Sequence, residues 1–249
     1  EEIATRYTHV KDWQQDGPAR ALDFVEAQFL RSGLCDRVFR QPIVVRGTPS
    51  FNVICEHTGV DDSERVVFGA HWDSTSDNPT VRAPGAVDDG SGTVSVLEVA
   101  RALGVLAREV GGRLPYTVHV AAWGGEEQGL YGSQQYVDEC VRNNVAIRQA
   151  IMADMTGYSR RYFGLKVEGT RDSDIQALMS VAKENTLSLG ELSHTQTSLS
   201  FGSDHVPFQK AGYPCVLFIQ QDDTNVAYFV WNALCYTGVC VCVCVCLCV

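Results

Sequence analysis

The chain has 249 residues, of which 45% are apolar and 20% are charged, and its formal net charge is -10 at pH 7. This length and composition are ordinary for one α/β domain with a substantial core. The negative charge argues against a nucleic-acid partner, since phosphate binding needs clustered Lys and Arg, and we interpret it as simple solubility. No apolar run before the C-terminal tail is long enough to cross a bilayer.

Apolar periodicity predicts alternating helices and strands. The predicted helices cover 18–32, 92–108, 130–142 and 172–187, and the predicted strands cover 43–46, 51–55, 66–70, 116–123, 146–153 and 214–219. The strands from 66 onward read as continuous apolar runs, which is typical of strands buried on both faces. The sequence therefore predicts an α/β fold with a mostly parallel central sheet and helices on both faces.

Polar side chains with metal-binding chemistry follow three of these strands directly. In order along the chain they are His71, the pair Glu126 and Glu127, and Asp154. Asp88 and Asp89 lie between the first two, on a tight loop that opens the helix predicted from 92. Functional sites of open α/β sheets lie beyond the carboxyl ends of the strands, so we expect all these side chains at one edge.

One His among several carboxylates suits zinc, and two ions roughly 3.5–4 Å apart can clamp a water between them. Two cations so close need a shared carboxylate, and Asp88 is the best candidate because of its loop. His71 and Asp154 would complete the protein ligands of one ion, and Glu127 would serve the other.

Two further carboxylates have predicted roles beside the metals. Glu126 precedes Glu127 and would point in a different direction from it. It would then be free to take a proton from the metal-bound water as a general base. Asp73 lies two residues after His71 and would accept a hydrogen bond from the ring nitrogen that does not bind metal. Each motif alone has a simpler explanation, such as a turn or a helix cap, so the prediction depends on the ordered set.

The ordered motifs resemble those of the co-catalytic zinc aminopeptidases of the bacterial and fungal leucine aminopeptidase type. The similarity runs from about Arg6-Tyr7 to about residue 225, and its motifs lie at 69–74, 83–103, 121–136, 153–158 and 202–214. The resemblance implies the same roles for the matching positions: His71, Asp88 and Asp154 for one zinc, Asp88 and Glu127 for the second, Glu126 as general base and Asp73 as partner of the His.

The resemblance also implies two roles outside the metal ligands. Asp89 would follow the bridging Asp88 through a cis peptide bond, and Asp204 would line the site without being the usual metal ligand. For the whole protein it implies a mixed central sheet, two Zn²⁺ ions, and hydrolysis that removes an N-terminal residue, often apolar, from peptides with a free N-terminus. An extracytoplasmic or secreted location is favoured by the resemblance alone.

The C-terminal part departs from the family pattern. The second zinc of the family takes its last His from a segment expected shortly after Tyr228, yet no His follows His205, and residues 239–249 read VCVCVCVCLCV. Translation of a GT dinucleotide repeat gives such an alternation. We therefore predict an incomplete aminopeptidase domain over 1–229 and an aberrant tail over 230–249, from a retained intron or a wrong gene model. A one-faced strand of thiols and a metal-binding tract are the alternatives.

Three other functions compete with an aminopeptidase. A glutaminyl-cyclase-like transferase with one zinc shares the Glu pair, although such proteins typically have Asp-Ser where this chain has Asp88-Asp89. A carboxypeptidase of the wider group needs an inserted domain for which the chain is too short. A non-catalytic binding module would have lost its metals, against which the intact set of His71 and carboxylates argues. His119, inside an apolar strand, is interpreted as a satisfied core histidine.

Overall fold

The computed structural model describes residues 5–8, 17–157, 164–169, 171, 173, 175, 176, 180, 191–196 and 202–220. Within these residues, eight strands form one mixed sheet in the order β1-β2-β4-β3-β5-β8-β6-β7. The strands are β1 (Arg37–Val45), β2 (Thr48–His57), β3 (Asp61–His71), β4 (Tyr116–Trp123), β5 (Ala146–Asp154), β6 (Gly164–Gly169), β7 (Glu191–Gln196) and β8 (Cys215–Gln220). The predicted α/β class with a mixed sheet is confirmed.

The four central strands β4, β3, β5 and β8 are parallel neighbours. The outer pairs β1–β2, β2–β4 and β6–β8 are antiparallel, and β6 pairs with β7 in parallel. Every residue of β8 and all but the first of β4 are buried, as expected for strands covered on both faces. The apolar runs of the sequence therefore mark the middle of the sheet.

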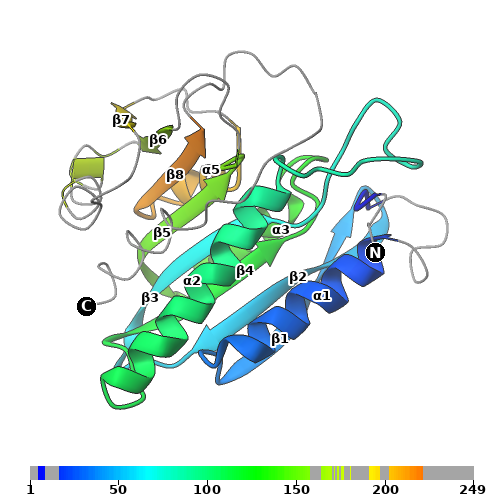
Figure 1. Ribbon diagram of the computed structural model, residues 1–249. Helices are drawn as coiled ribbons and strands as arrows, with labels where there is room; N and C mark the ends of the chain where they lie inside the picture. The colour runs from blue at the N-terminus through cyan, green and yellow to red at the C-terminus, as the bar shows by residue number, and fades with distance from the viewer. Residues whose placement is uncertain are drawn as a thin grey trace.

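Helices cover both faces of this sheet. Figure 1 shows α1 (Gly17–Ser32) and α2 (Gly90–Glu109) lying side by side on one face. The shorter helices α3 (Tyr131–Arg142) and α5 (His205–Lys210) pack on the other. Buried aromatic side chains fill both layers, with Phe29 and Phe68 in the first and Trp123 and Phe208 in the second.

The predicted elements and the structure differ mainly at the sheet edges. β1 begins at Arg37, six residues before the predicted start, because polar side chains interrupt its apolar pattern. It turns into β2 through Arg46 and Gly47, both with positive φ, the geometry of a tight hairpin turn. β6, β7 and α5 were not predicted. Of the helix predicted over 172–187, residues 173, 175, 176 and 180 are helical, and the other positions lie outside the described residues.

The residues beyond 220, which include the predicted tail and the segment after Tyr228, also lie outside the described part. The predicted boundary between 1–229 and 230–249 therefore stays a prediction.

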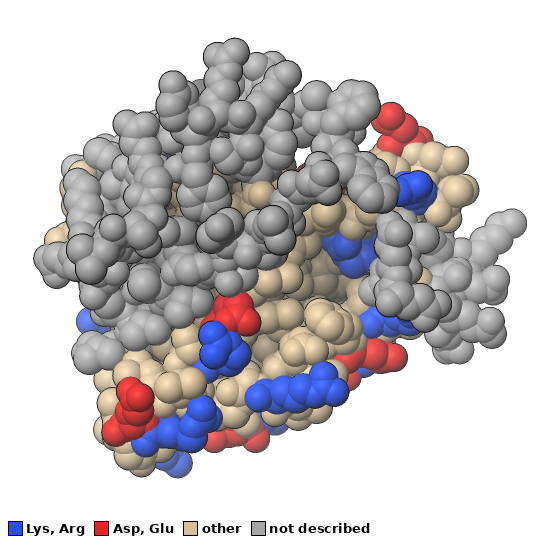
Figure 2. Space-filling model, viewed as in Figure 1, with Lys and Arg blue, Asp and Glu red and all other residues tan. Residues whose placement is uncertain are grey.

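Among the described residues, α2 alone is long and apolar enough to cross a membrane by length and composition. However, 56% of the relevant window is buried inside the domain. It packs on β3, β4 and α1, as a core helix does. Figure 2 shows basic and acidic side chains lying beside one another on the described part of one face.

A disulfide joins Cys35, after α1, to Cys55 in β2, and it closes a loop with a sequence separation of 20 residues. Crosslinks of this loop length stabilise proteins by about 3 kcal/mol. We expect the double variant Cys35→Ser/Cys55→Ser to lose about that much free energy of unfolding in urea titrations. Reductant should lower the stability of the original chain to that of the variant and leave the variant unchanged. If both proteins were equally stable without reductant, the disulfide would not stabilise the fold.

His119 of β4 lies in the core, where the sequence predicted it, and its ring contacts Tyr136 of α3. His119 is buried, with Nδ1 2.9 Å from the hydroxyl of Tyr136 and Nε2 3.1 Å from Oε2 of Glu56. The contact with His119, aided by Arg37, lowers the pKa of Glu56 to about 2. The ionised Glu56 thus stabilises the fold above its unfolded pKa of about 4.3, and this contribution is lost as the pH falls from there toward 2.

Glu56→Gln should therefore cost stability at pH 6 and about half as much at pH 3, because pH 3 lies between the two pKa values. The measurement is the difference in unfolding free energy between the original chain and the variant at the two pH values. A difference that is constant across this range would show that the Glu56 carboxylate gains nothing from His119.

Candidate metal centre

The strand order brings three strand ends together. β3 lies between β4 and β5 in the sheet, and all three run in the same direction. His71 is the last residue of β3 and Asp154 the last of β5, whereas the turn with Glu126 and Glu127 follows β4. Asp88 reaches the same edge from the loop before α2.

Three of these side chains converge on one point. Nε2 of His71 lies 3.3 Å from Oδ1 of Asp88 and 3.7 Å from Oδ1 of Asp154, and one ligand atom from each residue lies within 4.8 Å of the others. His71 and Asp154 are buried, and the two atoms that face each other, Nε2 and Oδ1, have no hydrogen-bond partner. Buried polar atoms are nearly always satisfied, so two unpartnered atoms that face each other beside Asp88 fit the binding of a cation.

The geometry of the three groups fits a zinc ion. Zinc bonds to nitrogen and oxygen of about 2.1 Å place tetrahedral ligand atoms about 3.4 Å apart, close to the separations of His71 from Asp88 and Asp154. An imidazole with two carboxylates is also a donor set that zinc accepts. The residues present therefore fit a zinc site that leaves a coordination position open.

Glu126 and Glu127 lie next to this group. Oε2 of Glu126 is 3.8 Å from Nε2 of His71. Burial, reinforced by the nearby carboxylates, raises the pKa of Glu126 to about 10. Burial and then repulsion from Asp88 raise the pKa of Glu127 to about 8. A bound cation would offset this repulsion, because opposite charges lower carboxyl pKa values.

Asp73 connects the His71 strand end to the glutamate turn. Its carboxylate oxygens accept hydrogen bonds from the backbone N–H groups of Glu126, at 3.1 Å, and of Glu127, at 3.3 Å. The same carboxylate lies 3.7 Å from Nδ1 of His71, which is closer, at 3.2 Å, to the backbone carbonyl of Asp73. The residue thus holds the turn through its side chain and faces the imidazole with both its carboxylate and its carbonyl.

Asp89 connects the end of β3, the start of α2 and the end of β5, which surround the candidate ligands His71, Asp88 and Asp154. Its buried carboxylate accepts hydrogen bonds from the backbone N–H groups of His71 (3.2 Å), Gly92 (2.8 Å) and Met155 (3.1 Å). These amides belong to the end of β3, the first turn of α2 and the residue after β5. The peptide bond between Asp88 and Asp89 is cis. Asp89 is thereby a structural carboxylate behind the candidate ligands.

The segment before α5 closes the site from another side. The hydroxyl of Ser203 donates a hydrogen bond to Oδ2 of Asp154 at 2.7 Å, which leaves Oδ1 facing His71. Asp204 is buried, and burial raises the pKa of its carboxyl to about 7. Burial lowers the pKa of His205 to about 4. Sequence reasoning included Asp204 but missed the orienting role of Ser203, its neighbour in the same motif.

A second residue that sequence reasoning missed is Arg6. Its guanidinium donates to the backbone carbonyls of Trp72 (2.6 Å), Pro84 (2.6 Å) and Gly85 (2.8 Å). These carbonyls lie on the loop between His71 and Asp88. Arg6 thereby fixes both ends of this loop, and only the folded chain reveals a contact across more than sixty residues.

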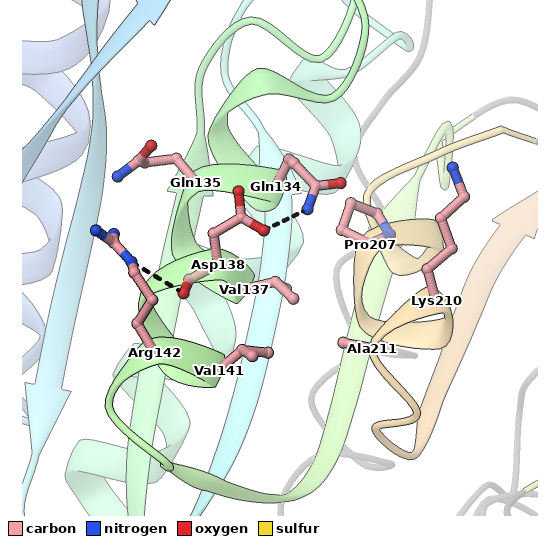
Figure 3. Close-up of a pocket in the computed structure, with 9 residues that line it drawn as sticks. All are labelled: Gln134, Gln135, Val137, Asp138, Val141, Arg142, Pro207, Lys210 and Ala211. Atoms are coloured by element: carbon pink, nitrogen blue, oxygen red, sulfur yellow. Dashed lines mark hydrogen bonds between the residues drawn. The ribbon is translucent and has the colours of Figure 1, made fainter.

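A separate groove of about 650 Å³ lies between α3 and α5. Figure 3 shows its lining, with Gln134 and Asp138 of α3 hydrogen-bonded to each other and Pro207 and Lys210 of α5 opposite. The groove contains none of the side chains described above, so it is distinct from the candidate metal centre.

Comparison with known proteins shows the family of the chain. The model of peptidase family M28 matches residues 52–229. A leucine aminopeptidase 1 of Aspergillus clavatus is 31% identical over 185 residues, which are 70% of this chain and 47% of that protein. The leucine aminopeptidase 1 of Emericella nidulans is 33% identical over 187 residues, with coverage of 70% and 46%. The chain spans about half the length of these relatives.

Solved structures show the same fold. LapA of Legionella pneumophila superposes with a TM-score of 0.78 over 99% of this chain and 69% of LapA, at 19% identity. A zinc aminopeptidase from Bacillus subtilis has a TM-score of 0.56 and 30% identity, over 71% of this chain and 41% of that protein. The family match covers most of the chain and includes the strand ends and loops that carry the candidate site, from His71 to Asp204. This chain is therefore a member of peptidase family M28.

Proposed function

We propose that the chain is a zinc-dependent aminopeptidase that hydrolyses the N-terminal peptide bond of peptides, preferentially after apolar residues. The observation that carries the proposal is the pair of buried, unpartnered atoms, Nε2 of His71 and Oδ1 of Asp154, beside Asp88 and 3.8 Å from Glu126. The names of the relatives, leucine aminopeptidase and zinc aminopeptidase, support the reaction and the metal.

In this proposal His71, Asp88 and Asp154 would hold one Zn²⁺, and Asp88 and Glu127 would hold a second. When bound, zinc polarises the scissile carbonyl and makes a bound water acidic enough to attack near neutral pH. The hydroxyl of Ser203 orients Asp154 by donating a hydrogen bond to its Oδ2, and the carboxylate of Asp89 holds the backbone of His71 by accepting a hydrogen bond from its N–H.

Glu126 transfers the proton in the reaction. Its carboxylate takes a proton from the attacking water as the oxygen adds to the carbonyl carbon. The same proton then passes to the leaving nitrogen as the carbon–nitrogen bond breaks, which gives a free amino acid and a shortened peptide. Asp73 holds the backbone of Glu126 during both transfers, and a positioned base of this kind contributes about 10²–10⁴ to the rate.

The substrate class is tested with three compounds. We expect hydrolysis of leucyl p-nitroanilide and none of its N-acetylated form, because an aminopeptidase needs the free amine. A peptide that begins with Gln serves as the probe for the cyclase alternative. Cyclisation of that peptide without cleavage of the leucyl compound would replace the aminopeptidase with a glutaminyl-cyclase-like transferase, and a chain that folds and binds zinc but acts on none of them would favour a binding module.

A further inference from the structure

Asn52, in the middle of β2, is fully buried and uses its side-chain amide completely. Oδ1 accepts a hydrogen bond from the backbone N–H of Gly124 at 3.0 Å. Nδ2 donates to the carbonyl of Gly132 at 2.9 Å and to Oε1 of Gln41 at 2.8 Å. Both N–H donors of the amide and its oxygen therefore have partners, an arrangement that a buried polar group needs.

The two backbone partners of Asn52 flank the turn that carries Glu126 and Glu127. Gly124 is the first residue after β4, and Gly132 is in the first turn of α3. The backbone bonds within this turn are short-range, such as those from the N–H groups of Gly129 and Leu130 to the carbonyl of Glu126. The long-range bonds to its middle come from the side chains of Asp73 and Arg46, the latter to the carbonyl of Gln128. Asn52 is thus the side chain that ties the two ends of the turn to each other and to the sheet.

The close approach at both ends depends on glycine. A Cβ atom at Gly132 would lie 2.2 Å from Oδ1 of Asn52, and one at Gly124 would lie 2.7 Å from the carbonyl of Phe51. Contacts this short would push the turn away from β2. The sequence therefore keeps both backbones within reach of the amide.

The orientation of the amide is also fixed from the far side. Gln41 donates to Oε2 of Glu139 at 2.6 Å, so its carbonyl oxygen is turned toward Nδ2 of Asn52. An Asp at position 52 would place a carboxylate oxygen against two acceptors, the carbonyls of Gly132 and Gln41. An Ala would remove the partner that Oδ1 gives the buried N–H of Gly124 and the bond from Nδ2 to the carbonyl of Gly132, and the loss of a buried partner is costly in a protein interior.

We propose that Asn52 is a positioning residue for the reaction: it holds the turn so that the Glu126 carboxylate stays at its working distance from the metal ligands. Asp73 holds the same turn through the amides of Glu126 and Glu127, and Asn52 holds its two ends. Displacement of a catalytic group by about 1 Å can cost about 10²-fold in rate. The inference rests on the proposed function of Glu126.

The first test does not depend on activity. Hydrogen–deuterium exchange of the full chain should be faster at the amides of residues 124–132 in Asn52→Ala and Asn52→Asp, and unchanged in β3 and β5. Asn143→Ala, a change at an exposed residue after α3, is the matched control and should alter neither region. Should Asn52→Ala fail to fold, Asn52→Asp, which keeps the size of the side chain, supplies the comparison. Unchanged exchange of 124–132 in the folded variants would overturn the proposal.

The second test separates positioning from general damage. In the zinc-loaded protein, kcat for leucyl p-nitroanilide should fall about 10–100-fold in the Asn52 variants, with KM and bound zinc unchanged. In a Glu126→Gln background the same Asn52 changes should cost almost nothing further, because their effect passes through Glu126. Additive losses, or a wild-type kcat in the Asn52 variants, would contradict the role of Asn52, whereas undiminished turnover of Glu126→Gln alone would contradict the proposed base.

Discussion

Glu126→Gln should lower kcat for leucyl p-nitroanilide by about 10²-fold or more while the protein keeps its zinc. The amide has the size of the carboxylate but cannot take a proton from the attacking water. Glu126 is 3.8 Å from Nε2 of His71 and is not one of the three converging groups, so we expect the metal to stay bound. Steady-state kinetics and metal analysis of the same preparation check both parts.

The matched control for this change is Glu109→Gln, at the exposed end of α2. It removes the same charge and should leave kcat and zinc content unaltered. If Glu126→Gln turned over the substrate at the original rate, Glu126 would not be the base. If it lost its zinc together with its activity, Glu126 would instead be a metal ligand.

The second large effect is expected for Asp88→Asn. Asp88 is the proposed shared ligand, with Oδ1 3.3 Å from Nε2 of His71. The substitution removes a negative charge that both proposed ions would share, and it should therefore weaken the binding of both. Asp154→Asn changes a proposed ligand of one ion only. We expect Asp88→Asn to retain less zinc than Asp154→Asn after dialysis against a weak chelator, and its kcat to fall at least 10²-fold.

An exposed aspartate in β3 provides the control for this pair. Asp62→Asn should keep the zinc and the activity of the original chain. Equal zinc loss in Asp88→Asn and Asp154→Asn would argue for a single ion held by both residues. If Asp88→Asn kept all of its zinc, Asp88 would not be a metal ligand.

The sequence predicted the central sheet better than its edges for a physical reason. Strands buried on both faces, such as 116–123, are continuous apolar runs, and the observed β4 has the same bounds. β1 is an edge strand with alternating exposed and buried residues, and β6 and β7 are short, so their patterns are weaker. Strand ends in the middle of the sheet are thus the most predictable positions, and these carry His71, Glu126 and Asp154.

The groups that hold the candidate ligands in place were harder to predict. Asp73 was expected beside His71, yet its bonds to the amides of Glu126 and Glu127 depend on the spacing between β3 and β4. Asn52 and Arg6 act on backbone groups that are far away in the sequence, at separations of 66 residues and more. An apolar strand that contains one Asn, or a lone Arg near the N-terminus, carries no local pattern for such contacts.

The most direct test of the account is a zinc titration of the metal-free chain, with leucyl p-nitroanilide hydrolysis and bound zinc measured in the same samples. We predict that the chelator-treated protein is inactive, that activity returns as zinc is added, and that His71→Ala neither binds the first equivalent tightly nor regains activity. Hydrolysis that persists without zinc, or a His71→Ala variant that recovers like the original chain, would contradict the assignment of His71, Asp88 and Asp154 as the metal centre of an aminopeptidase.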